Sequence, residues 1–271
     1  MSEPQILPAP FAGQHADLPG VRLWYVDTGG SGPVVVLLHA NTGTVRAWDA
    51  QLQALHGAGF RAIAFDRRGW GQSLAQPDTG AQPGSIAEDL AALMQDLGID
   101  RFGLLGIAGG GFAALDFAAW QPQRLTRLLV AGSNGQFSEP EMQALSARIA
   151  VPGLTGRIEV RPYLEVGVAY RAEDPEGFAR FIAMEHAARQ ADAPAQPLRT
   201  PNTFAKVAGI TTPTLVLMGG ADLLAPPALM RTWARHLPDV RFETIGDAGH
   251  SINWERPDAF NQHMLAFFQH G

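Results

Sequence analysis

Short apolar runs alternate with longer amphipathic segments along most of the chain. A short apolar run bounded by glycine or other turn residues predicts a buried strand, whereas apolar positions recurring every three to four residues predict a helix. The pattern therefore predicts an α/β protein with a mostly parallel sheet covered by helices on both faces. We expect strands at residues 21–27, 34–38, 60–65, 102–105, 125–130, 214–218 and 240–245, and helices at 46–58, 85–97, 109–120, 227–236 and 257–268.

This rhythm is interrupted between residues 133 and 206, where helical patterns occur without a convincing strand. Helices are expected there at residues 139–149, 162–171 and 175–189. A helical insertion of this kind is expected to cover the carboxyl ends of the strands, where open α/β sheets bind their ligands. We therefore predict a core domain formed by residues 1–132 and 207–271, with a helical cap over residues 133–206.

The composition excludes several classes of function. The 271 residues are 46% hydrophobic and carry a net charge of −6, so no basic surface is expected for nucleic acid or an anionic membrane. The absence of cysteine excludes disulfides and thiolate catalysis, and the histidines lack a metal-ligand spacing. No secretory signal pattern or membrane-spanning run is visible, so we expect a cytoplasmic protein with a small-molecule substrate and neither a metal nor an organic cofactor.

Residues 104–112 form the most informative motif. They predict a strand, a tight turn and a helix, with Gly106 and Gly110 at the two small positions of a nucleophile elbow. Ala108 occupies the central position, where an attacking oxygen or sulfur is expected. An alanine methyl group cannot attack a substrate, so the function depends on why Ala108 is there.

An acid and a histidine follow the last two predicted strands. Asp222 comes after the strand at 214–218, and His250 comes after the strand at 240–245. The chain order of elbow, acid and histidine is that of a hydrolase triad, in which the acid holds one imidazole nitrogen and the other nitrogen faces the substrate. We predict that Asp222 and His250 form a functional dyad.

Taken together, these motifs resemble the α/β-hydrolase fold over nearly the whole chain. Residues 39–43 (HANTG) resemble the family's oxyanion loop, with Ala40 in place of the usual glycine, and residues 66–73 (DRRGWGQS) resemble its D-x-R-G-x-G-x-S loop. The resemblance implies an eight-stranded sheet with the helical cap inserted after strand 6. It also implies an oxyanion hole formed by the backbone amides of Asn41 and Gly109, without fixing the substrate.

Three further expectations concern side chains around this site. Trp48, which follows the oxyanion loop, and His39 are the residues expected to line a substrate pocket. Asp66, Arg67 and Arg68 are expected to hold the sheet edge through arginine–backbone bonds. Residues 185–186 (Glu-His) are expected to lie on a solvated helix face.

Three functions remain open on the sequence alone. If Ala108 replaces a natural serine, the parent is a hydrolase of a small, moderately apolar ester, lactone or carbon–carbon bond that works through an acyl-enzyme. If Ala108 is native, His250 and Asp222 act as a general base in a cofactor-free oxygenase, a lyase or an enzyme of direct water attack. The third function is non-catalytic ligand binding. A homodimer is compatible with the sequence, which does not set the oligomeric state.

Overall fold

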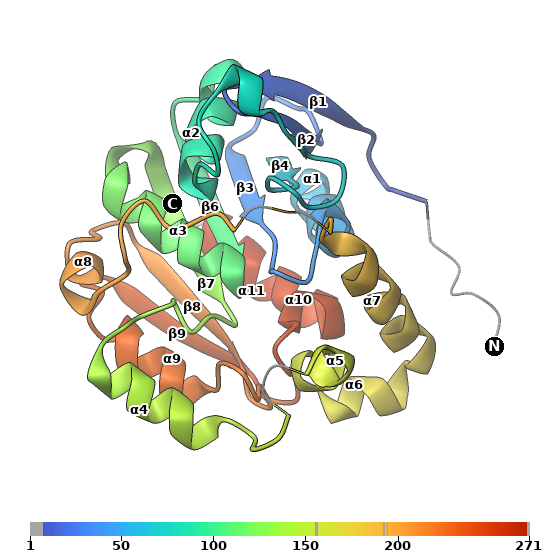
Figure 1. Ribbon diagram of the computed structural model, residues 1–271, viewed down its shortest axis with the longest axis vertical. Coiled ribbons are helices and arrows are strands. Elements are labelled where there is room, and N and C mark those ends of the chain that lie inside the picture. The colour runs from blue at the N-terminus through green and yellow to red at the C-terminus, as the bar shows by residue number, and fades with distance from the viewer. Residues whose placement is uncertain (1–7, 155–156, 192, 194, 270–271) are drawn as a thin grey trace.

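A mostly parallel sheet forms the centre of the molecule, with helices on both of its faces (Figure 1). The computed structural model describes residues 8–154, 157–191, 193 and 195–269. The strands follow the order β1-β2-β4-β3-β6-β7-β8-β9, with β5 paired to β2. They are β1 (Gly13–Leu18), β2 (Val21–Asp27), β3 (Val34–Leu38), β4 (Arg61–Phe65), β5 (Leu74–Ala75), β6 (Phe102–Ile107), β7 (Leu125–Ala131), β8 (Thr214–Gly219) and β9 (Val240–Ile245).

The predicted α/β-hydrolase architecture is confirmed, with one correction to the sheet. The main path has the eight strands that the resemblance implies, but the two-residue strand β5 adds a ninth among the described residues. Strands β1 and β5 were absent from the periodicity-based prediction. Strand β1 (GQHADL) is a polar edge strand, and β5 is too short to produce a pattern.

Alternation along the central strands divides the core into two clusters. In β3, Val36 and Leu38 pack into the cluster that contains the buried faces of α2 (Ile86–Asp96), α3 (Gly109–Trp120) and α9 (Pro227–Ala234). Val35 and Leu37 point the opposite way, toward α1 (Asp49–Gly57) and α11 (Pro257–Gln269). Because the side-chain period of a strand is two, a strand buried on both faces reads as a continuous apolar run.

The start of α2 follows its sequence signals closely. Ser85 is the N-cap residue, and its side chain accepts a hydrogen bond from the amide of Glu88 at 3.2 Å. The Ser85 hydroxyl also donates to the Glu88 carboxylate at 2.9 Å, which links the two side chains that a capping box uses. The helix end is therefore stabilised locally, as the sequence predicts.

The segment after β7 places its helices in different parts of the molecule. Helix α4 (Pro140–Ile149) buries Met142 in the same cluster as α9, and α8 (Phe204–Ala208) packs beside α3. Helices α5 (Arg161–Glu165), α6 (Val168–Glu173) and α7 (Pro175–Ala188) lie together near α10 (Ile252–Glu255) (Figure 1).

A small separate cluster contains Val166, which follows α5, Tyr170 of α6 and Phe181 of α7. The helix predicted at 162–171 is thus two helices, with Gly167 as the extended N-cap residue of α6. The division into a core and a cap at residues 133 and 206 stays a prediction. No helix in the described part of the chain has the length and apolar character needed to cross a bilayer.

Candidate active site

The turn between β6 and α3 has the backbone of a nucleophile elbow. Ala108 adopts φ 49° and ψ −115°, a conformation that is strained for any residue with a side chain. A Cβ atom on Gly106 would collide with the carbonyl of Gly110, so strand and helix pack this closely only because both positions are small. The sharp turn directs the methyl group of Ala108 into a cavity at the carboxyl ends of the strands.

His250 and Asp222, which are 28 residues apart in the chain, meet beside this cavity. Nδ1 of His250 lies 2.8 Å from Oδ2 of Asp222. The other oxygen of the carboxylate accepts hydrogen bonds from the amides of Leu224 at 2.7 Å and Ala225 at 2.8 Å. Asp222 is therefore fixed in place and orients the imidazole ring, whose Nε2 has no partner among the described residues.

The charges around His250 favour its protonated form. Burial by itself lowers the pKa of His250, but the carboxylates of Asp222, Glu165 and Glu255 outweigh it and raise the pKa to about 9. The amides of His250 and Ser251 donate to the backbone carbonyl of Glu165 at 2.9 and 3.0 Å. The surrounding carboxylates thus favour the imidazolium form, and the two backbone bonds hold the histidine loop against the end of α5.

Two backbone amides close to the elbow are free to bind an anion. Within the described residues, the N–H groups of Asn41 and Gly109 donate no hydrogen bond. The carboxamide of Asn41 packs so closely against the start of α3 that a Cβ on Gly109 would collide with it. Arg67 donates to the Asn41 side chain at 2.7 Å, and the Trp70 indole donates to the Asn41 carbonyl at 2.8 Å. The loop that carries Asn41 is therefore held beside Gly109, as an oxyanion hole requires.

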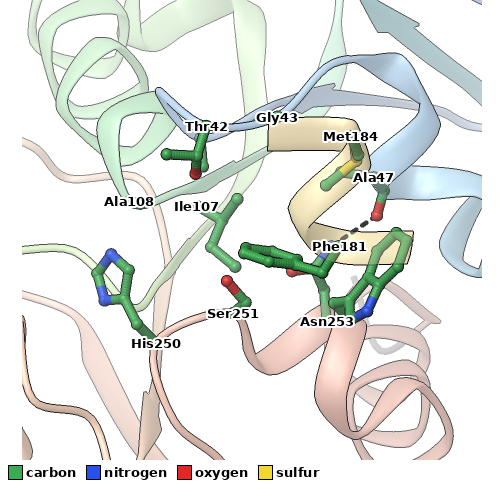
Figure 2. Close-up of a pocket in the computed structure, with 12 residues that line it drawn as sticks. Thr42, Gly43, Ala47, Ile107, Ala108, Phe181, Met184, His250, Ser251 and Asn253 are labelled. Atoms are coloured by element: carbon green, nitrogen blue, oxygen red, sulfur yellow. Dashed lines mark hydrogen bonds between the residues drawn. The ribbon is translucent and has the colours of Figure 1, made fainter. Parts of the chain in front are cut away.

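The cavity itself is small, with a volume of about 20 Å³, and lies between the elbow, the histidine loop and α7 (Figure 2). Its lining is largely apolar, with polar atoms from the loops after β3 and β9. The lining residues are Ala40, Thr42, Gly43, Ala47, Ile107, Ala108, Phe181, Met184, His250, Ser251, Asn253 and Trp254. The cavity therefore has room for about one water molecule beside Ala108.

A wider hollow of about 560 Å³ adjoins this cavity between α7 and α1. The two share the lining residues Ala47, Met184, Asn253 and Trp254. The charged groups of the hollow are paired, with Arg46 2.8 Å from Asp49 and Arg180 3.5 Å from Asp174. The hollow therefore extends the small cavity toward the surface.

The two residues predicted to line the pocket are not among those that line it. Trp48 is fully buried and packs against Phe260 in the core, because the short helix Val45–Trp48 turns its indole toward α11. Nε2 of His39 accepts the amide of Arg67 at 3.2 Å. Burial, followed by the charge of Arg67, lowers the pKa of His39 to about 3. His39 thus holds the loop as a neutral ring, and neither residue is proposed for substrate contact.

The arginine loop after β4 has the geometry of a structural element. Arg68 forms a buried ion pair with Asp89 at 2.6 Å. Its guanidinium also donates to the carbonyls of Pro19, Gly20 and Ala81, so it fixes the sheet edge. This is the arrangement that the sequence favoured for Arg68.

The expectation for residues 185–186 is wrong for one of the two residues. His186 is exposed, but Glu185 is buried against α5. Burial and the nearby charge of Glu165 raise the pKa of Glu185 to about 7. The buried carboxylate was missed because its helix has only a weakly amphipathic pattern.

Sequence reasoning also missed a contact between the oxyanion loop and α5. The Thr42 hydroxyl donates to the carboxylate of Glu165 at 2.6 Å across 123 residues of sequence. The sequence analysis considered the loop of Thr42 only for its backbone amides. The local pattern around Glu165 does not distinguish this residue from other acidic residues. Phe181 and Met184 of α7 also line the cavity.

The comparisons with known proteins agree with this architecture. Residues 35–263 match the alpha/beta hydrolase family. The chain belongs to that family. A curated relative of this α/β hydrolase, the 2-hydroxy-6-oxononadienedioate/2-hydroxy-6-oxononatrienedioate hydrolase of Burkholderia vietnamiensis, is 28% identical over 92% of this chain and 91% of its own.

Solved structures show the same fold. A thermophilic esterase from Thermogutta terrifontis superposes with a TM-score of 0.77 at 27% identity and covers 94% of this α/β hydrolase and 98% of its own chain. The enol-lactonase of Burkholderia xenovorans LB400 superposes with a TM-score of 0.75 at 23% identity, over 94% and 100% of the two chains. These relatives and neighbours are named as hydrolases that act on different substrates.

Proposed function

We propose that this protein hydrolyses small, moderately apolar carbonyl compounds (an ester, a lactone or an activated carbon–carbon bond) by direct attack of water. The observation that carries the proposal is the hydrogen-bonded pair of His250 and Asp222 at 2.8 Å, which faces a cavity where the elbow presents only the methyl group of Ala108. The pair can move a proton, and the elbow position carries no side-chain nucleophile.

In this mechanism the amides of Asn41 and Gly109 bind the carbonyl oxygen of the substrate as negative charge develops on it. The amide of Gly109 lies at the N-terminus of α3, where the helix dipole also favours an anion. One such donor contributes about 3 to 4 kcal/mol of transition-state stabilisation in enzymes where it has been removed. His250, oriented by Asp222, transfers protons at the reacting centre.

The space left by the missing side chain supports attack by water. Ala108, His250 and Ser251 line one small cavity, so a water beside the methyl group lies among polar atoms as well as apolar ones. The adjoining hollow extends the site and leaves room for the rest of the substrate. The hydrolase names of relatives and structural neighbours support the reaction class.

The test combines a substrate panel with a reporter of acyl-enzymes. Purified protein is assayed with short aryl esters, lactones and vinylogous diketones, and is incubated with a fluorophosphonate probe that labels activated serines. We expect turnover with no labelling in the unmodified chain, and loss of turnover in His250→Ala. Turnover accompanied by oxygen uptake would instead indicate oxygenase chemistry of the same pair.

A second candidate is an acyl-enzyme hydrolase with serine at position 108. It is favoured by the strained elbow backbone at Ala108, which has the form that presents a nucleophile. Sequencing codon 108 in the source gene separates the two. A serine codon would replace the water mechanism by an acyl-enzyme.

A further inference from the structure

The hydroxyl of Thr42 connects the cavity to a buried carboxylate. Thr42 lies in the loop after β3 and lines the cavity, whereas Glu165 is the last residue of α5. Thr42 Oγ1 donates to Glu165 Oε2 at 2.6 Å, and the two residues are only 5% and 6% exposed. Only the Thr42 hydroxyl therefore separates the Glu165 carboxylate from the space beside Ala108.

Thr42 and His250 approach that space from different loops. Figure 2 shows Thr42 in the upper part of the cavity, next to Gly43, and His250 in the lower part, with Ala108 and Ile107 between their levels. A carbonyl carbon bound near Ala108 thus has the Thr42 hydroxyl and the imidazole as separate polar neighbours. Two proton-transferring groups with different surroundings can divide the base and acid roles in hydrolysis by water.

Glu165 and His250 stabilise each other's charged forms, because one is an acid and the other a base. Burial, helped by the charge of Asp222, raises the pKa of Glu165 above its ordinary value, although His250, the Thr42 hydrogen bond and Arg161 act to lower it. Glu185 on α7 is the remaining carboxyl that interacts with Glu165.

On the other side of the pair, His250 is faced by three carboxylates. They are those of Asp222, Glu165 and Glu255, which outweigh burial and raise the pKa of His250 to about 9. The charge of each group thus favours the ionised form of the other. An imidazolium has no free lone pair, so it can give a proton to the substrate but cannot take one from water.

We propose that Thr42 and Glu165 form the proton relay that activates the attacking water, while His250 is the acid of the reaction. This inference rests on the proposed hydrolysis by water and assigns its two proton transfers. Thr42, which borders the cavity, is the catalytic residue of the relay. Glu165 acts through it and is a positioning residue for the same reaction.

The steps balance without a further reactant. The water oxygen forms a bond to the carbonyl carbon while the C=O π pair moves onto the oxygen bound by the Asn41 and Gly109 amides. The water proton passes to Thr42 Oγ1, and the Thr42 proton passes to Glu165 Oε2. The electron pair on the oxyanion then re-forms the C=O bond as the leaving group departs. Nε2 of His250 then protonates the leaving group as its bond to the carbonyl carbon breaks. The proton on Glu165 leaves through Thr42, and solvent reprotonates His250, which restores the starting charges.

The relay is tested with Thr42→Val and Glu165→Gln, which keep the volume of each side chain but remove the proton path. We expect each to lower kcat by about 100-fold, the usual scale for a lost general base, with KM nearly unchanged. The double variant should lose no more than the single ones, because the residues act as one unit. Thr42→Ser, which keeps the hydroxyl, should retain most of the activity.

Glu185→Gln is the matched control, since it removes a buried carboxylate next to Glu165 that does not contact Thr42. It should leave kcat nearly unchanged. Thr42→Val with more than half of the wild-type kcat, while His250→Ala is inactive, would overturn the relay and leave the proposed hydrolase intact. Activity that survives in His250→Ala would instead refute the proposed function itself.

The pH profile of the unmodified protein gives a test that needs no variant. With His250 as the acid, kcat/KM should fall as the pH rises through about 9, the pKa of the imidazole in the folded protein. A rate that rises through this range would show a neutral imidazole acting as the base and would refute the relay. In Glu165→Gln the fall of kcat/KM at alkaline pH should begin at lower pH, because one of the carboxylates that raise the His250 pKa is gone.

Discussion

Glu255 of α10 accepts a hydrogen bond from the amide of Gly249, the residue directly before His250, with 2.8 Å between nitrogen and oxygen. The same carboxylate accepts the amides of Gly167 at 2.9 Å and Ser251 at 3.1 Å. It is only 2% exposed. One buried side chain thus joins the histidine loop to the segment between α5 and α6, so the position of His250 depends on Glu255.

Replacing Glu255 by alanine should reduce both activity and stability. The change leaves three amides without their partner, and each buried unsatisfied group costs about 1 to 3 kcal/mol. We expect several kcal/mol of destabilisation by urea unfolding and a kcat reduced at least 10-fold in the remaining folded protein. Glu243→Ala, at an exposed position of β9, is the control and should change neither. Wild-type kcat in Glu255→Ala would show that the hydrogen bonds of Glu255 do not position His250.

The unfolding free energy should depend on pH through His250. Its pKa in the folded state, about 9, is above the unfolded value near 6.5, so the stabilisation is complete below pH 6.5 and is lost as the pH rises through 9. The loss amounts to about 3 kcal/mol at most. Urea unfolding of the wild type and His250→Gln at pH 6 and pH 9.5 measures it. An equal pH dependence in both proteins would contradict the raised pKa.

A glycine at position 108 should stabilise the fold. Backbone strain destabilises alanine at φ 49° by about 1 to 3 kcal/mol. Glycine relieves this strain but destabilises the fold by about 0.4 to 1 kcal/mol, because the unfolded chain gains conformational entropy. We expect Ala108→Gly to be the more stable protein by about 1 kcal/mol in urea unfolding. Ala119→Gly, inside α3, should be less stable by about 1 kcal/mol. Destabilisation of Ala108→Gly would show that the elbow is not strained.

A serine at position 108 should recreate an elbow nucleophile. The backbone already has the required turn, and the amide of Gly109 is free to bind the oxyanion. At a pH above about 9, where the imidazole of His250 is neutral and can take the serine proton, Ala108→Ser should therefore react with a fluorophosphonate probe, and the double variant Ala108→Ser/His250→Ala should not. Under the water mechanism the native reaction should not become faster. A large gain in kcat for the native substrate would favour the acyl-enzyme candidate.

The ion pair of Arg68 and Asp89 should be essential for stability. Both side chains are at most 4% exposed and lie 2.6 Å apart, so Arg68→Ala leaves a buried carboxylate uncompensated. Breaking such a pair costs about 3 to 5 kcal/mol. Arg157→Ala is the control, because Arg157 and its partner Glu159 are both largely exposed. Its loss of unfolding free energy should stay within about 1 kcal/mol. Equal melting temperatures for both variants would contradict this difference.

The sequence by itself determined the sheet core, the elbow and the pairing of Asp222 with His250. These features depend on local patterns, because apolar runs mark buried strands and parallel strands bring the loops at their carboxyl ends to one edge. Two loops that follow neighbouring strands therefore meet, and the structure places Nδ1 of His250 2.8 Å from Asp222. Edge strand β1 was not predicted, because its mostly polar residues do not form an apolar run.

Only the tertiary structure decided which side chains surround the dyad. Trp48 and His39 are next to the oxyanion loop in sequence, yet packing turns the indole into the core and fixes the imidazole on the backbone of Arg67. Glu165 is 123 residues from Thr42, and their contact depends on how the helices after β7 fold back over the sheet. Contacts of that kind are set by the packing of whole elements, which no local periodicity encodes.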